Sequence, residues 1–261
     1  MAETFTVPQR GVGLPDYSAP APIGQIPKPT TYTLSDMAEL AARLGSINTF
    51  DRRGDVIWLD DFENNINKWL TYAVGTGGSV ALSNDRARNG AMSAKLVTPS
   101  DALLAARIYR DFPYPEVGKI GAEISFTIDN DLDFFQLGLQ FWTETKYTNS
   151  LLRYLPSEKA LYYADSDGVI KVLLSNVNLF ATTPLFHTLK LVVDIKTDKY
   201  VRALLDSYYV DMSDIACRTT TGVYTKDMNS QIVAMGKAGL NITIYIDDFI
   251  LTQNEPVNVY V

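Results

Sequence analysis

Hydrophobic and polar residues alternate along much of the chain after residue 55, with the period of two that is typical of β-strands. Residues 122–128 (AEISFTI) and 134–142 (FFQLGLQFW) show the pattern most clearly. In the second stretch Phe135, Leu137, Leu139 and Phe141 form one face. Strand candidates recur about every 8 to 15 residues with no long helical pattern between them, which predicts an all-β, antiparallel two-sheet sandwich.

Turn residues divide the later part of this region into hairpins. Residues 159–174 (KALYYADSDGVIKVLL) predict two strands around a turn at Asp167 and Gly168. Residues 187–206 predict two more around Lys196 to Asp198, and residues 239–252 predict a final strand. A chain of this length and pattern is normally one domain, so we assign residues 56–253 to a single sandwich and residues 254–261 to a C-terminal tail.

The first 55 residues have a different character. Residues 1–32 contain six prolines, which exclude a continuous helix or a central strand and predict an extended arm. Residues 33–55 contain one short helix and a connector, and the helix carries Met37, Leu40 and Leu44 on one face. We expect this stripe, together with Phe5 and Leu14 of the arm, to contact a partner subunit or protein. A solvent-exposed tail is the alternative for the arm.

One short phrase occurs twice, near each end of the predicted sandwich. VIWLDDFENN stands at residues 56–65 and IYIDDFILTQ at residues 244–253. Each has hydrophobic residues followed by Asp-Asp-Phe, as expected for two strands that end in carboxylates. The repetition raises three alternatives, which are a metal site, a catalytic carboxylate pair and a structural seam.

Three segments carry a resemblance to a known superfamily. LFHTLKLVVDIKTDKYVRALLDSYYVDMS (185–213) resembles the central hairpin of the concanavalin A-like lectin/glucanase jelly rolls. DDFENNINKW (60–69) and IYIDDFIL (244–251) are similar to the ends of carbohydrate-binding-module jelly rolls. The resemblance covers roughly residues 56–253 and implies a jelly-roll sandwich whose first and last strands pair. The seam would then take its core contacts from Ile57, Leu59, Phe62, Ile244, Ile246 and Phe249.

The same resemblance implies a structural calcium ion as the one candidate cofactor. In the similar modules the glutamate of an opening Phe-Glu and an aspartate of the closing strand bind the ion. The matching positions in this chain are Glu63 and Asp247 or Asp248. Oxygen-rich ligands of this kind suit Ca²⁺. A further ligand from a middle loop is required, and the sequence does not identify it. The alternative is that these strand-end carboxylates bind backbone groups or solvent.

Composition and sequence pattern argue against several functions. The 261 residues have a formal net charge of −7 and no cluster of Lys and Arg, which disfavours nucleic-acid binding. No apolar run approaches the roughly 20 residues of a membrane helix. The N-terminus lacks the pattern of a secretory signal. The single cysteine, Cys217, and the single histidine, His187, are expected to be structural.

The candidate chemistry favours binding over catalysis. Glucanases of the resembled superfamily carry acids at alternating strand positions, and no E-x-D-x-E-like run occurs here. Asp129, Asp131 and Asp133 alternate but precede a strand, so we expect no enzyme activity from them. Gln136, Gln140 and Trp142 share a strand face, and Tyr162, Tyr154 or Tyr163 is expected beside them. Aromatic rings stack on sugars and amides bond to hydroxyls, so these residues predict glycan binding, with packing against a loop or subunit as the alternative.

The predicted arm favours a role in the assembly of a larger particle. A sandwich with an extended arm and no signal sequence is an arrangement used by bacteriophage virion proteins. We therefore expect a non-catalytic structural or interaction protein, made in the cytoplasm and located in the virion. The expected partners are further copies of the chain or other virion proteins, contacted through the arm. A carbohydrate-binding module is the alternative and a glycoside hydrolase is third.

Overall fold

The computed structural model describes residues 53–115, 118–181 and 185–256. Every described residue belongs to one unit of the chain, which spans Thr49–Val261. All regular elements of the described residues are β-strands, which confirms the all-β prediction. None of these residues forms a helix with the length and hydrophobicity needed to cross a membrane. The predicted arm and helix, with Phe5, Leu14, Met37, Leu40 and Leu44, lie outside the described residues, as does tail segment 257–261.

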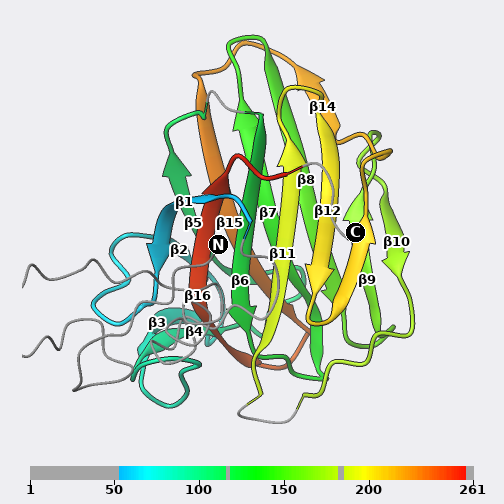
Figure 1. The fold of residues 1–261 in the computed structure, drawn as a ribbon. Coiled ribbons are helices and arrows are strands. Elements are labelled where there is room, and N and C mark those ends of the chain that lie inside the picture. The colour runs from blue at the N-terminus through cyan, green and yellow to red at the C-terminus, as the bar shows by residue number, and fades with distance from the viewer. Residues whose placement is uncertain (1–52, 116–117, 182–184, 257–261) are drawn as a thin grey trace, which may run out of the picture. The chain divides into compact units, whose positions relative to one another are not determined.

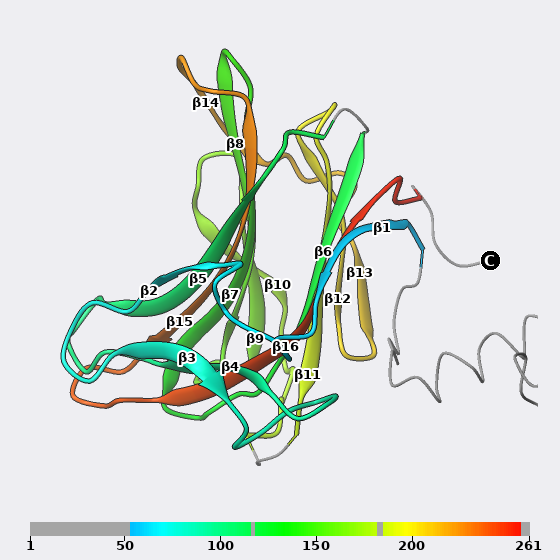
Figure 2. The same cartoon turned by 90° about the vertical axis from the view of Figure 1, so that its left-hand side faces the viewer.

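The strands form two antiparallel eight-stranded sheets, which are the two layers visible in Figures 1 and 2. In sheet A the strands lie in the order β13 (Tyr208–Asp211), β12 (Lys199–Leu205), β11 (His187–Asp194), β6 (Lys119–Phe126), β16 (Thr243–Gln253), β4 (Ser93–Val97) and β3 (Ser79–Ser83). The eighth strand, β1 (Asp55–Asp60), pairs with β16. This arrangement confirms the predicted two-sheet sandwich.

Sheet B forms the second layer. Its β14 (Arg218–Thr221) pairs with β8, and the other strands lie in the order β10 (Ile170–Leu174), β9 (Ala160–Ala164), β8 (Lys146–Leu155), β7 (Leu132–Trp142), β15 (Asp227–Gly236), β5 (Ala105–Phe112) and β2 (Leu70–Tyr72). The turn between β9 and β10 contains Gly168 at φ 80°, a backbone conformation that suits glycine. Both predicted hairpins are therefore confirmed.

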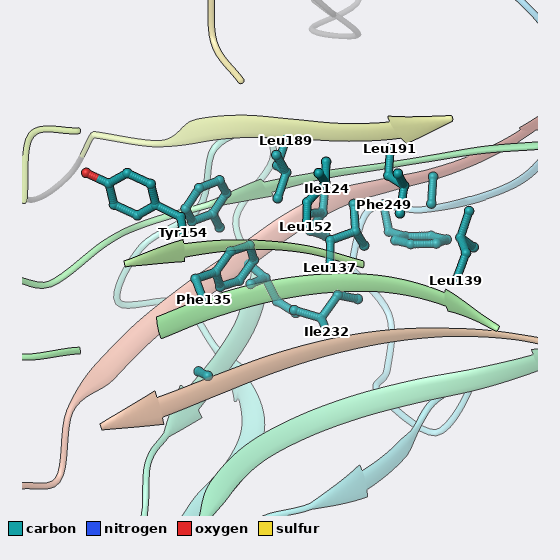
Figure 3. Close-up of a cluster of buried hydrophobic side chains, with 14 of the residues drawn as sticks. Ile124, Phe135, Leu137, Leu139, Leu152, Tyr154, Leu189, Leu191, Ile232 and Phe249 are labelled. Atoms are coloured by element: carbon teal, nitrogen blue, oxygen red, sulfur yellow. The ribbon is translucent and has the colours of Figure 1, made fainter. Parts of the chain in front are cut away.

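One hydrophobic core fills the space between the sheets (Figure 3). The alternation in β7 directs Phe135, Leu137 and Leu139 inward, where all three are fully buried. The rings of Phe126 in β6 and Phe135 in β7 stack with centroids 4.0 Å apart and thereby join the two sheets. The inward face predicted for residues 134–142 is confirmed.

The first and last strands of the sandwich pair, as the repeated phrase predicts. Register partners run from Asp55 opposite Gln253 to Asp60 opposite Phe249. Phe62, Ile244, Ile246 and Phe249 are fully buried as expected, but the prediction for Ile57 and Leu59 is wrong, since they are 40% and 55% exposed. A register shift between Val56 and Trp58 reverses the alternation, so that Trp58 faces the core instead.

Phe249 lies at the centre of an aromatic cluster at this seam. Its ring centroid is 5.0 Å from that of Trp69 and 5.6 Å from that of Trp58, with the ring planes inclined at 89° and 56°. The side chain of Asp60 supports the cluster, because it accepts hydrogen bonds from Trp69 Nε1 at 2.8 Å and from Lys68 Nζ at 2.9 Å. The first aspartate of the opening phrase is therefore a structural residue.

The segment after β16 is fixed by a buried carboxylate. Glu255 accepts from Lys190 Nζ at 2.8 Å and from the guanidinium of Arg202, and all three side chains are almost fully buried. Gly121 leaves room for this carboxylate, since a Cβ there would lie 2.6 Å from Glu255 Oε1. Buried ion pairs of this kind are costly to break, because the remaining buried charges lose a counter-charge.

His187 and Cys217 have the structural environments expected of them. The ring nitrogens of His187 lie 2.6 Å from Asp206 Oδ2 and 3.2 Å from the Phe180 carbonyl oxygen, and the side chain is buried. Cys217 is buried and unpaired, and burial raises the pKa of its thiol. Neither residue has the exposure that a nucleophile or a general base needs.

Candidate functional site

The outward surface of sheet B carries polar and aromatic side chains suited to a ligand. Core residues alternate along β7, so Gln136, Gln140 and Trp142 point away from the core. Strand register places each of them beside outward-facing residues of neighbouring strands. We call this surface the sheet B outer face.

A row of polar residues crosses this face. Register pairs Asp111 of β5 with Asn229 of β15, Asn229 with Gln140 of β7, Gln140 with Asn149 of β8, and Asn149 with Arg218 of β14. The Asn229 amide donates to Asp111 Oδ1 at 2.6 Å, and Gln140 Nε2 donates to Asn149 Oδ1 at 3.4 Å. Five polar side chains from five strands thus form a continuous row of donors and acceptors.

Aromatic residues lie two register positions beyond the polar row, on the same face. The rings of Trp142 and Tyr147 stack with centroids 5.1 Å apart and planes inclined at 25°, and Tyr224 lies 6.2 Å from Tyr147. Trp142 and Tyr147 are partly exposed. Burial raises the pKa of the Tyr147 phenol above its ordinary value. A partly exposed aromatic platform beside an amide row matches the stacking surface and hydroxyl partners that sugars require.

A second row passes through Gln136. It runs Tyr72, Arg107, Val233, Gln136, Arg153, Tyr162 and Val172 across seven strands. Gln136 is 6% exposed, and its Oε1 accepts from Arg153 Nε at 3.1 Å and Nη2 at 2.8 Å. The Tyr162 hydroxyl donates to the Glu158 carboxylate, and this hydrogen bond raises the pKa of Tyr162.

The structure therefore brings the four predicted sugar-binding residues to one face. Gln140 and Trp142 are accessible, whereas Gln136 and Tyr162 are largely buried by their neighbours. The two tyrosines given as alternatives to Tyr162 face the core. Tyr154 is 1% exposed and donates from its hydroxyl to the Val177 carbonyl at 2.9 Å, and Tyr163 packs against Tyr200.

The sequence did not predict several of the residues that lie on this face. Arg107, Tyr147, Asn149, Arg153 and Asn229 lie on strands distant from β7 in sequence or outside the stretch we considered. A signal was present in β8, where outward-facing Tyr147, Asn149 and Arg153 alternate with inward-facing residues. Sequence alone did not place β5 and β15 beside each other.

The residues predicted to bind calcium lie around one loop, the β3–β4 connection at residues 84–92. Glu63 Oε1 accepts from the backbone N–H groups of Ala91 and Met92, both at 2.8 Å. Asp247 Oδ2 accepts from the N–H groups of Arg88 and Asn89 at 2.8 and 3.3 Å. The loop offers these carboxylates N–H donors, which are not ligands for a cation.

Hydrogen bonds from nearby N–H groups account for the positions of the Glu63, Asp247 and Asp248 carboxylates. Asn89 Nδ2 donates to Asp248 Oδ2 at 2.5 Å, so N–H donors face all three carboxylates. Within the described ranges, no group of three or more His, Cys, Asp or Glu side chains is arranged to hold a metal ion. The side chains as arranged do not fit a calcium ligand set, and the calcium site stays a prediction that chelation tests.

The closing pair of aspartates is electrostatically strained. Burial and the neighbouring Asp248 charge raise the pKa of Asp247 to about 7, although three N–H donors oppose the rise. Burial also raises the pKa of Asp248, against the opposing effects of Arg88 and Asn89. Asp248 has φ 49°, at a register shift in β16 between Asp247 and Ile250. The shift turns Phe249 into the core while both carboxylates face the loop.

The acids at 129, 131 and 133 do not form a catalytic row. Asp129 caps the turn before β7 by accepting from the Asp131 N–H at 2.8 Å, and Asp131 pairs with Lys237 at 2.8 Å. Only Asp133 lies within β7. The three acids therefore do not share one strand face.

Comparison with known proteins places the fold but not the activity. The sequence matches no protein-family model and no curated protein. In structure it is similar to an endo-β-1,4-glucuronan lyase from the fungus Trichoderma reesei, with a TM-score of 0.52, 10% identity, and coverage of 77% of this chain and 96% of that one. A β-glucanase from Bacillus licheniformis has a TM-score of 0.46 and 12% identity, with coverage of 78% and 100%. The lectin UEA-II complexed with galactose has a TM-score of 0.46 and 10% identity, with coverage of 77% and 100%.

The similarity to the glucuronan lyase supports the two-sheet sandwich fold. It corrects the prediction that the protein is not an enzyme, since the same fold carries a lyase. The missing E-x-D-x-E pattern argues only against one kind of glucanase site, and one fold hosts many activities. Neither the fold nor these neighbours support the virion, capsid and oligomer interpretation.

Proposed function

We propose that the sheet B outer face binds a polysaccharide chain. The observation that carries the proposal is the stacked pair Trp142 and Tyr147 beside the amides of Gln140, Asn149 and Asn229. The ring pair offers a flat apolar surface to a pyranose, and the amides offer both donors and acceptors to its hydroxyls. The row extends over five strands, which is long enough for several sugar residues.

The stacked pair also makes the proposal testable with one substitution. Affinity electrophoresis in gels containing soluble polysaccharides would measure binding of the wild type, Trp142→Ala and Tyr208→Ala. Tyr208 is 43% exposed on sheet A and serves as the matched aromatic control. We expect Trp142→Ala to weaken binding about tenfold or more, which corresponds to about 1.4 kcal/mol, and Tyr208→Ala to leave it unchanged.

The same mixtures should be assayed for new reducing ends and for unsaturated products. The fold carries enzymes as well as binding modules, so turnover is measured alongside binding. If no polysaccharide in a broad panel is retained, or if Trp142→Ala binds as tightly as the wild type, the proposal is refuted. The outer face would then be assigned to packing against another protein.

A further inference from the structure

The sheet B outer face is rich in arginines that lack acidic partners, although the whole chain has a net charge of −7. Arg107, Arg153 and Arg218 face outward from β5, β8 and β14. Within the described ranges no ion pair joins any of the three to a carboxylate. Lysines elsewhere are commonly paired, for example Lys95 with Asp85 and Lys171 with Asp165. The contrast marks this face as a place where positive charge is left uncompensated.

Arg107 and Arg153 occupy the same row and are each held against an aromatic ring. The Arg153 guanidinium lies 4.0 Å from the Phe134 ring centroid and donates twice to Gln136. The Arg107 guanidinium lies 4.3 Å from the ring centroid of Tyr72, and its Nε is buried without a hydrogen-bond acceptor. A guanidinium has five N–H donors, so both side chains are oriented and keep donors unused.

Both guanidiniums carry an energetic cost that a bound anion would relieve. Burial lowers the pKa of Arg153, because its charge is partly removed from water with no counter-charge. The acids of the same face have other partners: Asp111 accepts from Asn229, Asp227 from the Met228 N–H, and Glu158 from Tyr162. An external carboxylate is therefore the missing partner in this row.

We infer that the polysaccharide bound by the sheet B outer face carries carboxylates, as in a chain of uronic acids, and that Arg107 and Arg153 select it. This inference rests on the proposed function and names its substrate class. The planar fork of arginine matches a carboxylate with two parallel hydrogen bonds. Arg107 and Arg153 are three strands apart, about 14 Å at the usual strand spacing of about 4.8 Å, so one carboxylate cannot contact both.

The separation predicts recognition of an oligosaccharide and not of a single sugar. Two carboxylates on one chain would engage the two arginines together, and the second contact benefits from a high effective concentration. A free uronic acid should therefore compete poorly with its own polymer. The polar row through Gln140 would bind hydroxyl groups of the same chain.

The experiment compares polyuronates with their carboxyl-reduced counterparts, which keep the backbone and linkage and lose the charge. Polygalacturonate, polyglucuronate and alginate, each with its reduced form, would be tested by affinity electrophoresis against wild type, Arg107→Gln, Arg153→Gln and Arg153→Lys. Lys199→Gln, an exposed residue of β12 in sheet A, is the charge-matched control. Urea unfolding of each variant would check that the fold is intact.

We expect at least one polyuronate to bind about tenfold or more tightly than its reduced form. Each arginine substitution should weaken that binding about tenfold, including Arg153→Lys, which keeps the charge but loses the fork, whereas Lys199→Gln should not. Equal affinity for a polyuronate and its reduced form would overturn the inference and leave the proposed function standing. Equal binding of dextran sulfate would also overturn it, since attraction to any polyanion would then suffice. Failure to retain any polysaccharide would refute the proposed function itself.

Discussion

Truncation of Phe249 tests whether the last strand holds the sandwich closed. The ring is fully buried between the sheets and contacts Trp58 and Trp69. Phe249→Ala removes those contacts and leaves a cavity, for which buried phenylalanines typically cost about 3–5 kcal/mol. Since the free energy of unfolding of a typical domain is about 5–15 kcal/mol, we expect the variant to lose a large part of its stability.

The assay and its control come from the same pair of strands. Urea unfolding followed by tryptophan fluorescence is suitable, because Trp58 and Trp69 lie in the cluster. Leu59→Ala also removes a large apolar group, but from a side chain that is 55% exposed on the opposite face of β1. Its cost should stay below about 1 kcal/mol. A Phe249→Ala loss of the same small size would show that the closing strand is not packed into the core.

Three further predictions concern the ends of the chain and its carboxylates. Glu255→Ala should lower the free energy of unfolding in urea by about 3 kcal/mol or more, because Lys190 and Arg202 stay buried without this partner. A loss below about 1 kcal/mol would contradict a stabilising role for this buried carboxylate. If calcium binds at Glu63, Asp247 and Asp248, EDTA should lower the melting temperature and added Ca²⁺ restore it, whereas identical melts would leave these residues the role of loop anchors. Deletion of residues 1–50 should leave a soluble sandwich that melts cooperatively, as measured by circular dichroism. An unfolded product would show that residues 56–253 do not fold without the first 50 residues.

The local pattern was sufficient to predict β7, the β9–β10 and β11–β12 hairpins and the final strand. Alternation directed the odd-numbered residues of 135–141 inward, and Gly168 marked the β9–β10 turn, because both effects act between residues close in sequence. The exposed positions of Ile57 and Leu59 could not be predicted in this way. A single extra residue in β1 reverses its faces, and the pairing with β16 that reveals the shift joins residues almost 200 positions apart.

The same limit applies to the candidate site. Gln136, Gln140 and Trp142 share one strand, so their common face followed from the sequence. The arginines at 107 and 153 are separated by 46 positions and meet in one row only because β15 and β7 lie between them. The apparent absence of a basic cluster was a property of the linear order and did not extend to the folded surface.

The positions of β15 and β16 have a consequence for how the protein is made. β16 joins β6, β4 and β1 in sheet A, and β15 joins β7 to β5 in sheet B. Sheet A is therefore in three pieces and sheet B in two until the final strand of each is made. A ribosome adds these strands after all the others, at about 5–20 residues per second. During that interval the nascent chain exposes unpaired edges at the centre of both layers, which are sites of aggregation. The sandwich is therefore incomplete until residues 227–253 have been made, and a chain that stops before residue 243 cannot close sheet A.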